Sequence, residues 1–385
     1  MSALRKSLIL GVALCWGGVA YATTLRPEVG VPLQQAGQAL SEHRYSEALA
    51  DVARAEAVPG KSATESFTID EMKAAIDTSR GAREAAASDY AALEASGMLS
   101  GDELMRIIEA EASSYYEAGD YSHAASVIRA HLANDPRYHQ LLLQSYLKTG
   151  ACTQLSSAVG LHGSADDMKL VAYCFATNKD HAGYVQALIN IVHAYPTPAN
   201  WTELLGELQA NPVYSGRLAL DFFRVQRAAG VALTASDYME ATQEALQAFQ
   251  NNEAKEIMAQ GYAQKILGVG PDEPRQARLM KLIDQRIADQ NTNEIQAAKQ
   301  AVAAGDDLTL FNIGFNKVQG GDKSGLQMME SAIQSGGIVQ IPQAKLELGL
   351  AYKAAGEPKK AEAEWKSIKG NDGAAALAHL WMGMK

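Results

Sequence analysis

Apolar residues recur at three- and four-residue steps along nearly the whole chain, which is the spacing of one face of an α-helix. The segments that carry this pattern are rich in Ala, Leu, Glu, Gln and Lys, which favour helices. Breakers containing Gly or Pro separate the segments at steady intervals. Only residues 338–341 look like a strand, and Pro342 directly after them is typical of the first turn of a helix. The pattern therefore predicts an all-α protein.

The regular spacing of the breakers indicates internal repeats. The clearest unit covers residues 108–136, with aromatic and small residues on two helices and a Gly-Asp-Tyr turn between them. A second clear unit surrounds Gly349 and Gly356. A third lies 35 residues before it, where Gly314 and Gly321 occupy the same offsets. We therefore expect consecutive hairpins of two helices each.

The quoted units resemble the tetratricopeptide repeat, a helix–turn–helix motif of about 34 residues. In such a unit a small residue such as Gly349 lies where two helices cross, and a large one such as Trp365 fills the space between hairpins. The resemblance implies an α-solenoid of stacked hairpins. The signature fades between Asp166 and Gly305, although the helical pattern continues. The chain is also similar to exported proteobacterial tetratricopeptide proteins that close with Leu-Trp, here Leu380-Trp381.

These patterns divide the chain into four segments. We expect a signal peptide at residues 1–22 and tetratricopeptide-like helical hairpins at residues 23–162. Degenerate helical hairpins follow at residues 163–305. Tetratricopeptide hairpins with a closing helix then occupy residues 306–385.

The first segment has the pattern of a cleaved secretory signal. Arg5 and Lys6 precede the apolar run Leu8–Val19, and Ala20-Tyr21-Ala22 is a small-x-small cleavage signal. The alternative is a retained membrane anchor, but the run is shorter than the roughly 20 residues that a spanning helix needs. We therefore expect a periplasmic protein with no transmembrane anchor after cleavage.

The charge of the processed chain argues against nucleic-acid binding. Without Arg5 and Lys6, 32 basic residues remain against 44 acidic ones, a net charge of −12. Such a surface repels phosphate backbones, and no cluster of Lys and Arg with interleaved aromatic residues counteracts the repulsion. Nucleic acid is therefore not an expected partner.

Two cysteines, Cys152 and Cys174, remain after processing. An oxidising compartment permits a disulfide between them. Each is equally interpretable as a small buried core residue. The sequence leaves both interpretations open.

Searches for catalytic motifs find no supported site. Residues 320–325 faintly resemble a phosphate-binding loop, but Asp322 separates the glycines from Lys323 and no apolar strand leads in. Metal-ligand spacings and a nucleophile elbow are missing from the sequence. Glu347 and Glu362 are at spacings typical of solvent-facing helical positions. We therefore predict neither an enzyme nor a cofactor.

In tetratricopeptide proteins the first helices of successive hairpins line a concave, ligand-binding groove, so the resemblance implies partner-binding residues here. The N-terminal part of the expected groove is polar and the C-terminal part is apolar. Phe311 and Phe315, four residues apart, share a helix face, and they either dock a partner segment or form core between hairpins. The implied residues are Arg106, Glu109, Tyr116, Gln144, Lys148, Phe311, Phe315, Leu346, Leu350 and Lys353.

The sequence thus predicts a periplasmic scaffold or adaptor that binds a protein or peptide segment, in cell-envelope assembly, secretion or polymer export. One alternative is a helical envelope enzyme, a lyase or hydrolase acting on polysaccharide, with Tyr238, Glu240 and Glu244 as the place to look. A second alternative is a carrier of a small ligand or lipid.

Overall fold

The computed structural model describes residues 25–214, 216–370 and 373–384. Helix accounts for 78% of the structure, and the described residues contain no strand, which confirms the all-α prediction. The predicted signal peptide lies outside the described residues. No helix in the described part of the chain combines the length and the apolar character needed to cross a membrane.

The chain forms two compact units, the first ending at Gly160 and the second beginning at Leu161. This boundary lies close to the one predicted at residue 162. The second unit contains both the predicted degenerate hairpins and the predicted C-terminal hairpins, so the contacts do not separate these two segments.

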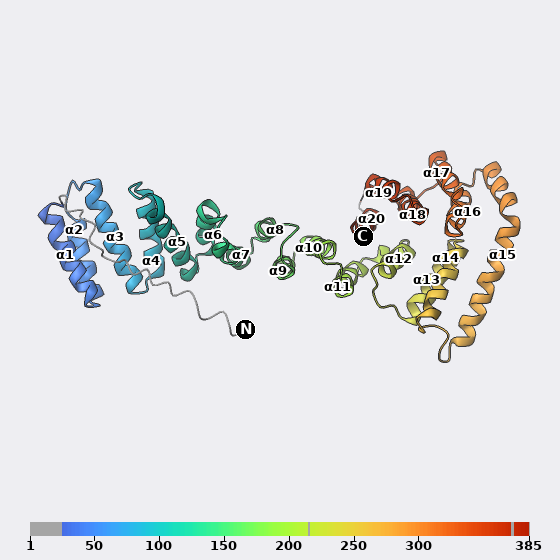
Figure 1. The fold of residues 1–385 in the computed structure, drawn as a ribbon, viewed down its shortest axis with the longest axis horizontal. Helices are drawn as coiled ribbons and strands as arrows, with labels where there is room; N and C mark the ends of the chain where they lie inside the picture. The colour runs from blue at the N-terminus through green and yellow to red at the C-terminus, as the bar shows by residue number, and fades with distance from the viewer. Residues whose placement is uncertain (1–24, 215, 371–372, 385) are drawn as a thin grey trace. The chain divides into compact units, whose positions relative to one another are not determined.

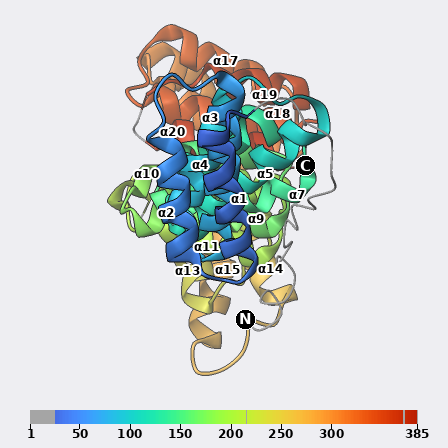
Figure 2. The same ribbon diagram turned by 90° about the vertical axis from the view of Figure 1, so that its left-hand side faces the viewer.

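Unit 1, residues 25–160, is a row of helical hairpins that follow one another in chain order (Figure 1). Figure 2 views this unit with α1 and α2 in front. A π-helical turn, η1, continues α6. The elements are α1 (Pro27–Ser41), α2 (Tyr45–Glu56), α3 (Ala63–Ser79), α4 (Arg83–Ala95), α5 (Gly101–Ala118), α6 (Tyr121–Val127), η1 (Ile128–Leu132), α7 (Pro136–Thr149) and α8 (Cys152–Val159).

Apolar contacts between neighbouring helices hold this row together. Val29 and Leu33 of α1, Val52 of α2, and Ile69 and Ile76 of α3 form one buried cluster. Each hairpin leaves an apolar side that only the next hairpin can cover, which is why such units stack.

The helix ends follow from local sequence. Ser62 and Glu65 form a capping box at the start of α3, in which each side chain bonds the other residue's backbone N–H. Gly119 ends α5 in the left-handed conformation at φ 85°, which a residue without Cβ adopts at little cost. The turn before α6 therefore forms where the repeat pattern places it.

Unit 2, residues 161–384, contains the remaining helices. Among these is α15, a helix of 32 residues, much longer than its neighbours. The elements are α9 (Ala165–Thr177), α10 (His181–Ala194), α11 (Pro198–Gln209), the 3-10 turn η2 (Pro212–Tyr214), α12 (Ala219–Ala228), α13 (Ala235–Gln247), α14 (Asn251–Ala263), α15 (Glu273–Ala304), α16 (Asp307–Gln319), α17 (Gly325–Ser335), α18 (Ile341–Ala354), α19 (Pro358–Ser367) and α20 (Ala374–Gly383).

The helices of unit 2 turn back on themselves (Figure 1). The last helix, α20, packs against α18 and α19 and also against α10 and α12 near the beginning of the unit. Leu377, Leu380 and Trp381 of α20 are buried in these contacts. Unit 2 is therefore a closed arrangement rather than an open row.

The C-terminal repeat has the close helix crossing that its sequence predicts. A Cβ added to Gly349 of α18 would lie 2.1 Å from the indole Nε1 of Trp365 in α19. That nitrogen donates a hydrogen bond of 3.1 Å to the carbonyl oxygen of Leu346. The Trp365 ring stacks on Trp381 of α20 with 6.0 Å between centroids. Gly349 thus lets Trp365 join three helices.

We predict that Gly349→Ala lowers the free energy of unfolding by about 1–3 kcal/mol, because the new Cβ displaces Trp365 and weakens its bond to Leu346. Gly206→Ala is the matched control, since Gly206 is helical and has no atom within 4 Å of an added Cβ. Alanine there should raise stability by up to about 1 kcal/mol. Denaturant unfolding followed by circular dichroism measures both; equal shifts in the two variants would contradict the prediction.

Candidate functional site

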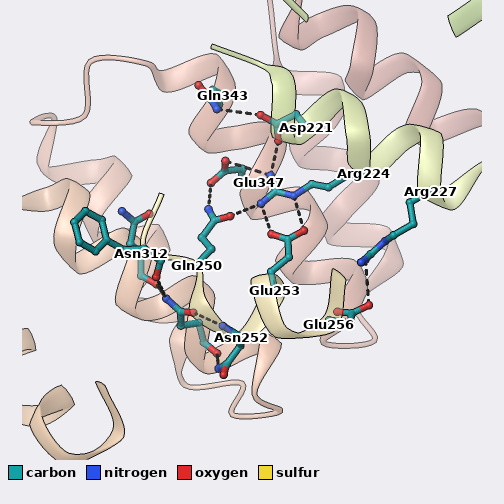
Figure 3. Close-up of polar contacts among 12 residues, drawn as sticks. Asp221, Arg224, Arg227, Gln250, Asn252, Glu253, Glu256, Asn312, Gln343 and Glu347 are labelled. Atoms are coloured by element: carbon teal, nitrogen blue, oxygen red, sulfur yellow. Dashed lines mark hydrogen bonds and ion pairs between the residues drawn. The ribbon is translucent and has the colours of Figure 1, made fainter. Parts of the chain in front are cut away.

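A buried ionic cluster lies inside unit 2 and is centred on Arg224 of α12 (Figure 3). The Arg224 side chain is 4% exposed. Its Nη1 donates to Asp221 Oδ1 at 2.6 Å and to Glu347 Oε1 at 3.3 Å, and its Nε donates to Glu253 Oε1 at 2.8 Å. Gln250 accepts from Arg224 Nη2 and donates to Glu347 Oε2 at 3.1 Å. One guanidinium therefore serves three carboxylates and one amide.

Three helices that are distant in sequence supply this cluster. Asp221 and Arg224 come from α12, Glu253 from α14, and Glu347 from α18, which lies 123 residues after Arg224. The guanidinium also lies 5.2 Å from the ring centroid of Phe315 in α16, within cation–π range. The cluster thus ties four helices of unit 2 together at one point.

Burial shapes the protonation of the cluster. Removal from water raises the pKa of Glu347 to about 7, an effect that Arg224 opposes and that Asp221 and Glu253 add to. Burial likewise raises the pKa of Asp221, against the attraction of Arg224. Because one cation faces three acids, a proton on one carboxyl reduces the excess negative charge. The expectation that Glu347 faces solvent is wrong, since it is 7% exposed.

A cavity of about 480 Å³ lies beside this cluster, between the α13–α14 turn, α15 and α16. Its inner wall carries buried residues of α14 and α16, and its mouth carries exposed residues of the turn and of α15. Most of the polar side chains are neutral amides. The lining residues are Phe249, Asn251, Arg286, Asp289, Gln290, Asn293, Ala297, Thr309, Asn312, Ile313 and Asn316.

The Asn316 side chain fixes the wall of this cavity. Its Nδ2 donates to the carbonyl oxygens of Phe249 at 2.5 Å and of Asn312 at 3.0 Å. Its Oδ1 accepts from the backbone N–H of Asn252 at 3.3 Å, and its carbonyl oxygen accepts from Asn252 Nδ2 at 2.9 Å. Figure 3 shows Asn252 and Asn312 in this network. The α13–α14 turn is thereby held against α16.

In unit 1, the residues that the resemblance implies for a binding face are accessible to varying degrees. Arg106 and Lys148 are exposed, whereas Tyr116 and Gln144 are half-buried. Glu109 of α5 is also half-buried, and it forms an ion pair with Arg137 of α7 at 2.5 Å. Because α5 and α7 are the first helices of successive hairpins, this pair joins neighbouring strips of the predicted face.

In unit 2, the predicted apolar groove is not an accessible surface. Phe311, Phe315 and Leu346 are at most 1% exposed, so they are core between helices, and docking on an exposed phenylalanine pair is excluded in this arrangement. Leu350 is half-buried. Lys353 is exposed, with its Nζ 4.8 Å from the Trp381 ring centroid. The physical reason for this correction is that α14, α15, α17 and α18 all pack against α16.

The predicted disulfide residues lie in different units. Cys152 begins α8 of unit 1 and is 6% exposed, and Cys174 lies in α9 of unit 2 and is fully buried. Burial is compatible with both interpretations of these cysteines, and the disulfide between them stays a prediction.

Sequence reasoning missed both the Arg224 cluster and the amide-lined cavity. The proximity of Asp221 and Arg224 is visible as a three-residue spacing on one helix. Nothing local connects them with Glu347. The amides of the cavity come from three helices, so no motif marks them. No family model matches the chain, and no curated protein matches its sequence.

We predict that Arg224→Ala lowers the free energy of unfolding by about 3–5 kcal/mol, because three carboxylates then stay buried without their cation. Arg227→Ala is the matched control on the same helix. Arg227 pairs with Glu256, whose side chain is 57% exposed, so its loss should cost less than about 1 kcal/mol. Chemical denaturation of the two variants tests this; similar losses would contradict a special role for Arg224.

A second prediction concerns pH. The carboxyl of Glu347 ionises near its usual pKa of 4.5 in the unfolded chain, but near 7 in the folded chain. Between these values the folded state holds a proton that the unfolded state has lost, so stability falls as the pH rises. Glu347→Gln should remove on the order of 2 kcal/mol of this fall in the free energy of unfolding. Unfolding measured from pH 4.5 to 8 tests this, with exposed Glu362→Gln as the control that should keep the wild-type slope.

Proposed function

We propose that the chain is a non-catalytic binding protein, a scaffold or adaptor whose unit 1 binds a segment of another protein. The observation that carries the proposal is the side-by-side arrangement of first helices in unit 1. α1 contacts α3, and Glu109 of α5 pairs with Arg137 of α7. Rows of this kind present long continuous surfaces, which suit extended partners.

The chemistry of this face supports a polar partner segment. Arg106 and Lys148 offer exposed cationic groups, and the half-buried Gln144 offers an amide that both donates and accepts hydrogen bonds. The ring of Tyr116 packs edge-on against Tyr121 of α6 at 5.2 Å, so it is held in place at the surface. An ordered aromatic ring costs little conformational entropy when a partner binds.

A periplasmic location belongs to the same proposal. It rests on the basic start, the apolar run and the small-x-small signal in residues 1–22. Work in cell-envelope assembly, secretion or polymer export would follow from that location and from a binding role.

The residues named for an enzyme give that alternative little support. Tyr238 is 1% exposed, and its hydroxyl donates to Gln264 Oε1 at 3.1 Å. Glu240 and Glu244 line a small hollow of about 80 Å³ that does not include Tyr238. Tyr238 therefore does not converge with the two carboxylates on this hollow, as joint action on one bond would require.

The proposal is tested by site-specific photo-crosslinking in the source cell. A p-benzoylphenylalanine residue in place of Arg106 or Lys148 should give covalent adducts with one partner protein, since both positions are exposed on the proposed face. The same residue at Ser126, exposed on α6, is the control and should give no such adduct. Adducts that form equally from Ser126, or none from α5 and α7, would refute the proposed face.

A further inference from the structure

Phe249 is an exposed aromatic residue in a strained backbone conformation. It is 67% exposed, and its φ is 58°, in the left-handed region. Most left-handed turn positions described in this chain are glycine; the others are His43, Lys179, Lys265 and Phe249. A bulky residue there costs about 1–2 kcal/mol relative to glycine. Burial of this exposed side chain recovers little of that conformational cost. Folding stability therefore does not account for a phenylalanine here, whereas contact with a ligand would.

The surrounding structure holds Phe249 at the mouth of the amide-lined cavity. The Asn316 amide bonds the Phe249 carbonyl oxygen, and the Phe249 N–H bonds the carbonyl oxygen of Leu246 at 3.3 Å. The backbone of Phe249 is therefore held on both sides, which places its exposed side chain at the edge of the cavity. An exposed aromatic ring at the edge of a concave site is a ready contact surface.

The cavity exists because the middle of α15 stands away from its neighbours. All 32 residues of α15 are described, and the buried ones are Gln276, Ile283 and Ala301. Between Ile283 and Ala301 polar side chains connect α15 to the rest. Gln290 accepts from Asn251 Nδ2 at 2.8 Å, and Glu294 pairs with Lys317 at 2.8 Å. Polar bridges in place of apolar packing keep the space beneath this helix open.

The lining specifies the chemistry of a ligand. It contains one cationic side chain, Arg286, and one anionic side chain, Asp289, so it favours no net charge. The remaining polar groups are one hydroxyl and five amides, each amide able to donate and to accept. The Oδ1 of Asn251, in a residue 8% exposed, has no hydrogen-bond partner among the described residues. An unpaired buried acceptor is costly, and a donor from a ligand would relieve that cost.

We propose that this cavity is a binding site for a neutral saccharide. Sugar hydroxyls both donate and accept hydrogen bonds, as the amides of Asn293 and Gln290 do. The apolar C–H face of a sugar ring would lie against the exposed ring of Phe249. A volume of about 480 Å³ is within the ordinary range for small-ligand pockets. This site is independent of the protein-binding face proposed for unit 1.

The test begins with the full chain on arrays of neutral oligosaccharides, of uronate oligosaccharides and of unmodified peptides. We expect binding to neutral glycans. The strongest neutral glycan is then titrated calorimetrically against wild type, Phe249→Gly and Asn293→Ala. Phe249→Gly should weaken binding at least about tenfold while keeping or raising the melting temperature, because glycine suits the left-handed turn. Asn293→Ala should also weaken binding without loss of fold.

Lys265→Gly is the matched control. Lys265 is another left-handed, non-glycine position (φ 58°), it follows α14, and it does not line the cavity. Its substitution should relieve similar strain and leave glycan affinity unchanged. Three results would overturn the proposal: no neutral glycan bound on the array, binding confined to uronates or peptides, or affinity that Phe249→Gly does not change. None of these three results bears on the protein-binding face proposed for unit 1.

Discussion

The structure of unit 2 depends on the neutralisation of one buried charge. A guanidinium removed from water is stable only where carboxylates and amides reach it, and its planar fork donates hydrogen bonds to them in few geometries. Asp221, Glu253 and Glu347 therefore fix how α12, α14 and α18 lie relative to one another. Once these helices are joined, α16 is enclosed and its phenylalanines become core. The same enclosure brings the α13–α14 turn against α16, where the amide-lined cavity forms.

Unit 1 is built on a different principle. Its hairpins are joined by apolar contacts between neighbours, and ion pairs such as that of Glu109 with Arg137 link successive hairpins. Such contacts bind each hairpin to the next without drawing the ends of the row together. The first helices thus keep accessible polar side chains such as Arg106 and Lys148, whereas Phe311, Phe315 and Leu346 at the corresponding positions of unit 2 are buried.

The features that the sequence predicts correctly are local ones. Helix periodicity, the left-handed turn at Gly119 and the close crossing at Gly349 depend on residues near each other in the chain. The helical spacing of Glu347 is that of a polar face and predicts that its side chain faces solvent. Its burial follows from a partner 123 residues away, which no local pattern records. Phe311 and Phe315 illustrate the same limit: their shared face was predictable, but what covers that face was not.

The connection between Arg224 and Glu347 also constrains the order in which the parts of the chain can fold. Hairpins of unit 1 need only their neighbours, so each can become stable through contacts that are local in sequence. The centre of unit 2 stays incomplete until Glu347 of α18 reaches Arg224, and α12 lacks part of its packing until α20 joins it. Because Arg224 and Glu347 are 123 residues apart, we expect unit 2 to close more slowly than the hairpins of unit 1 form.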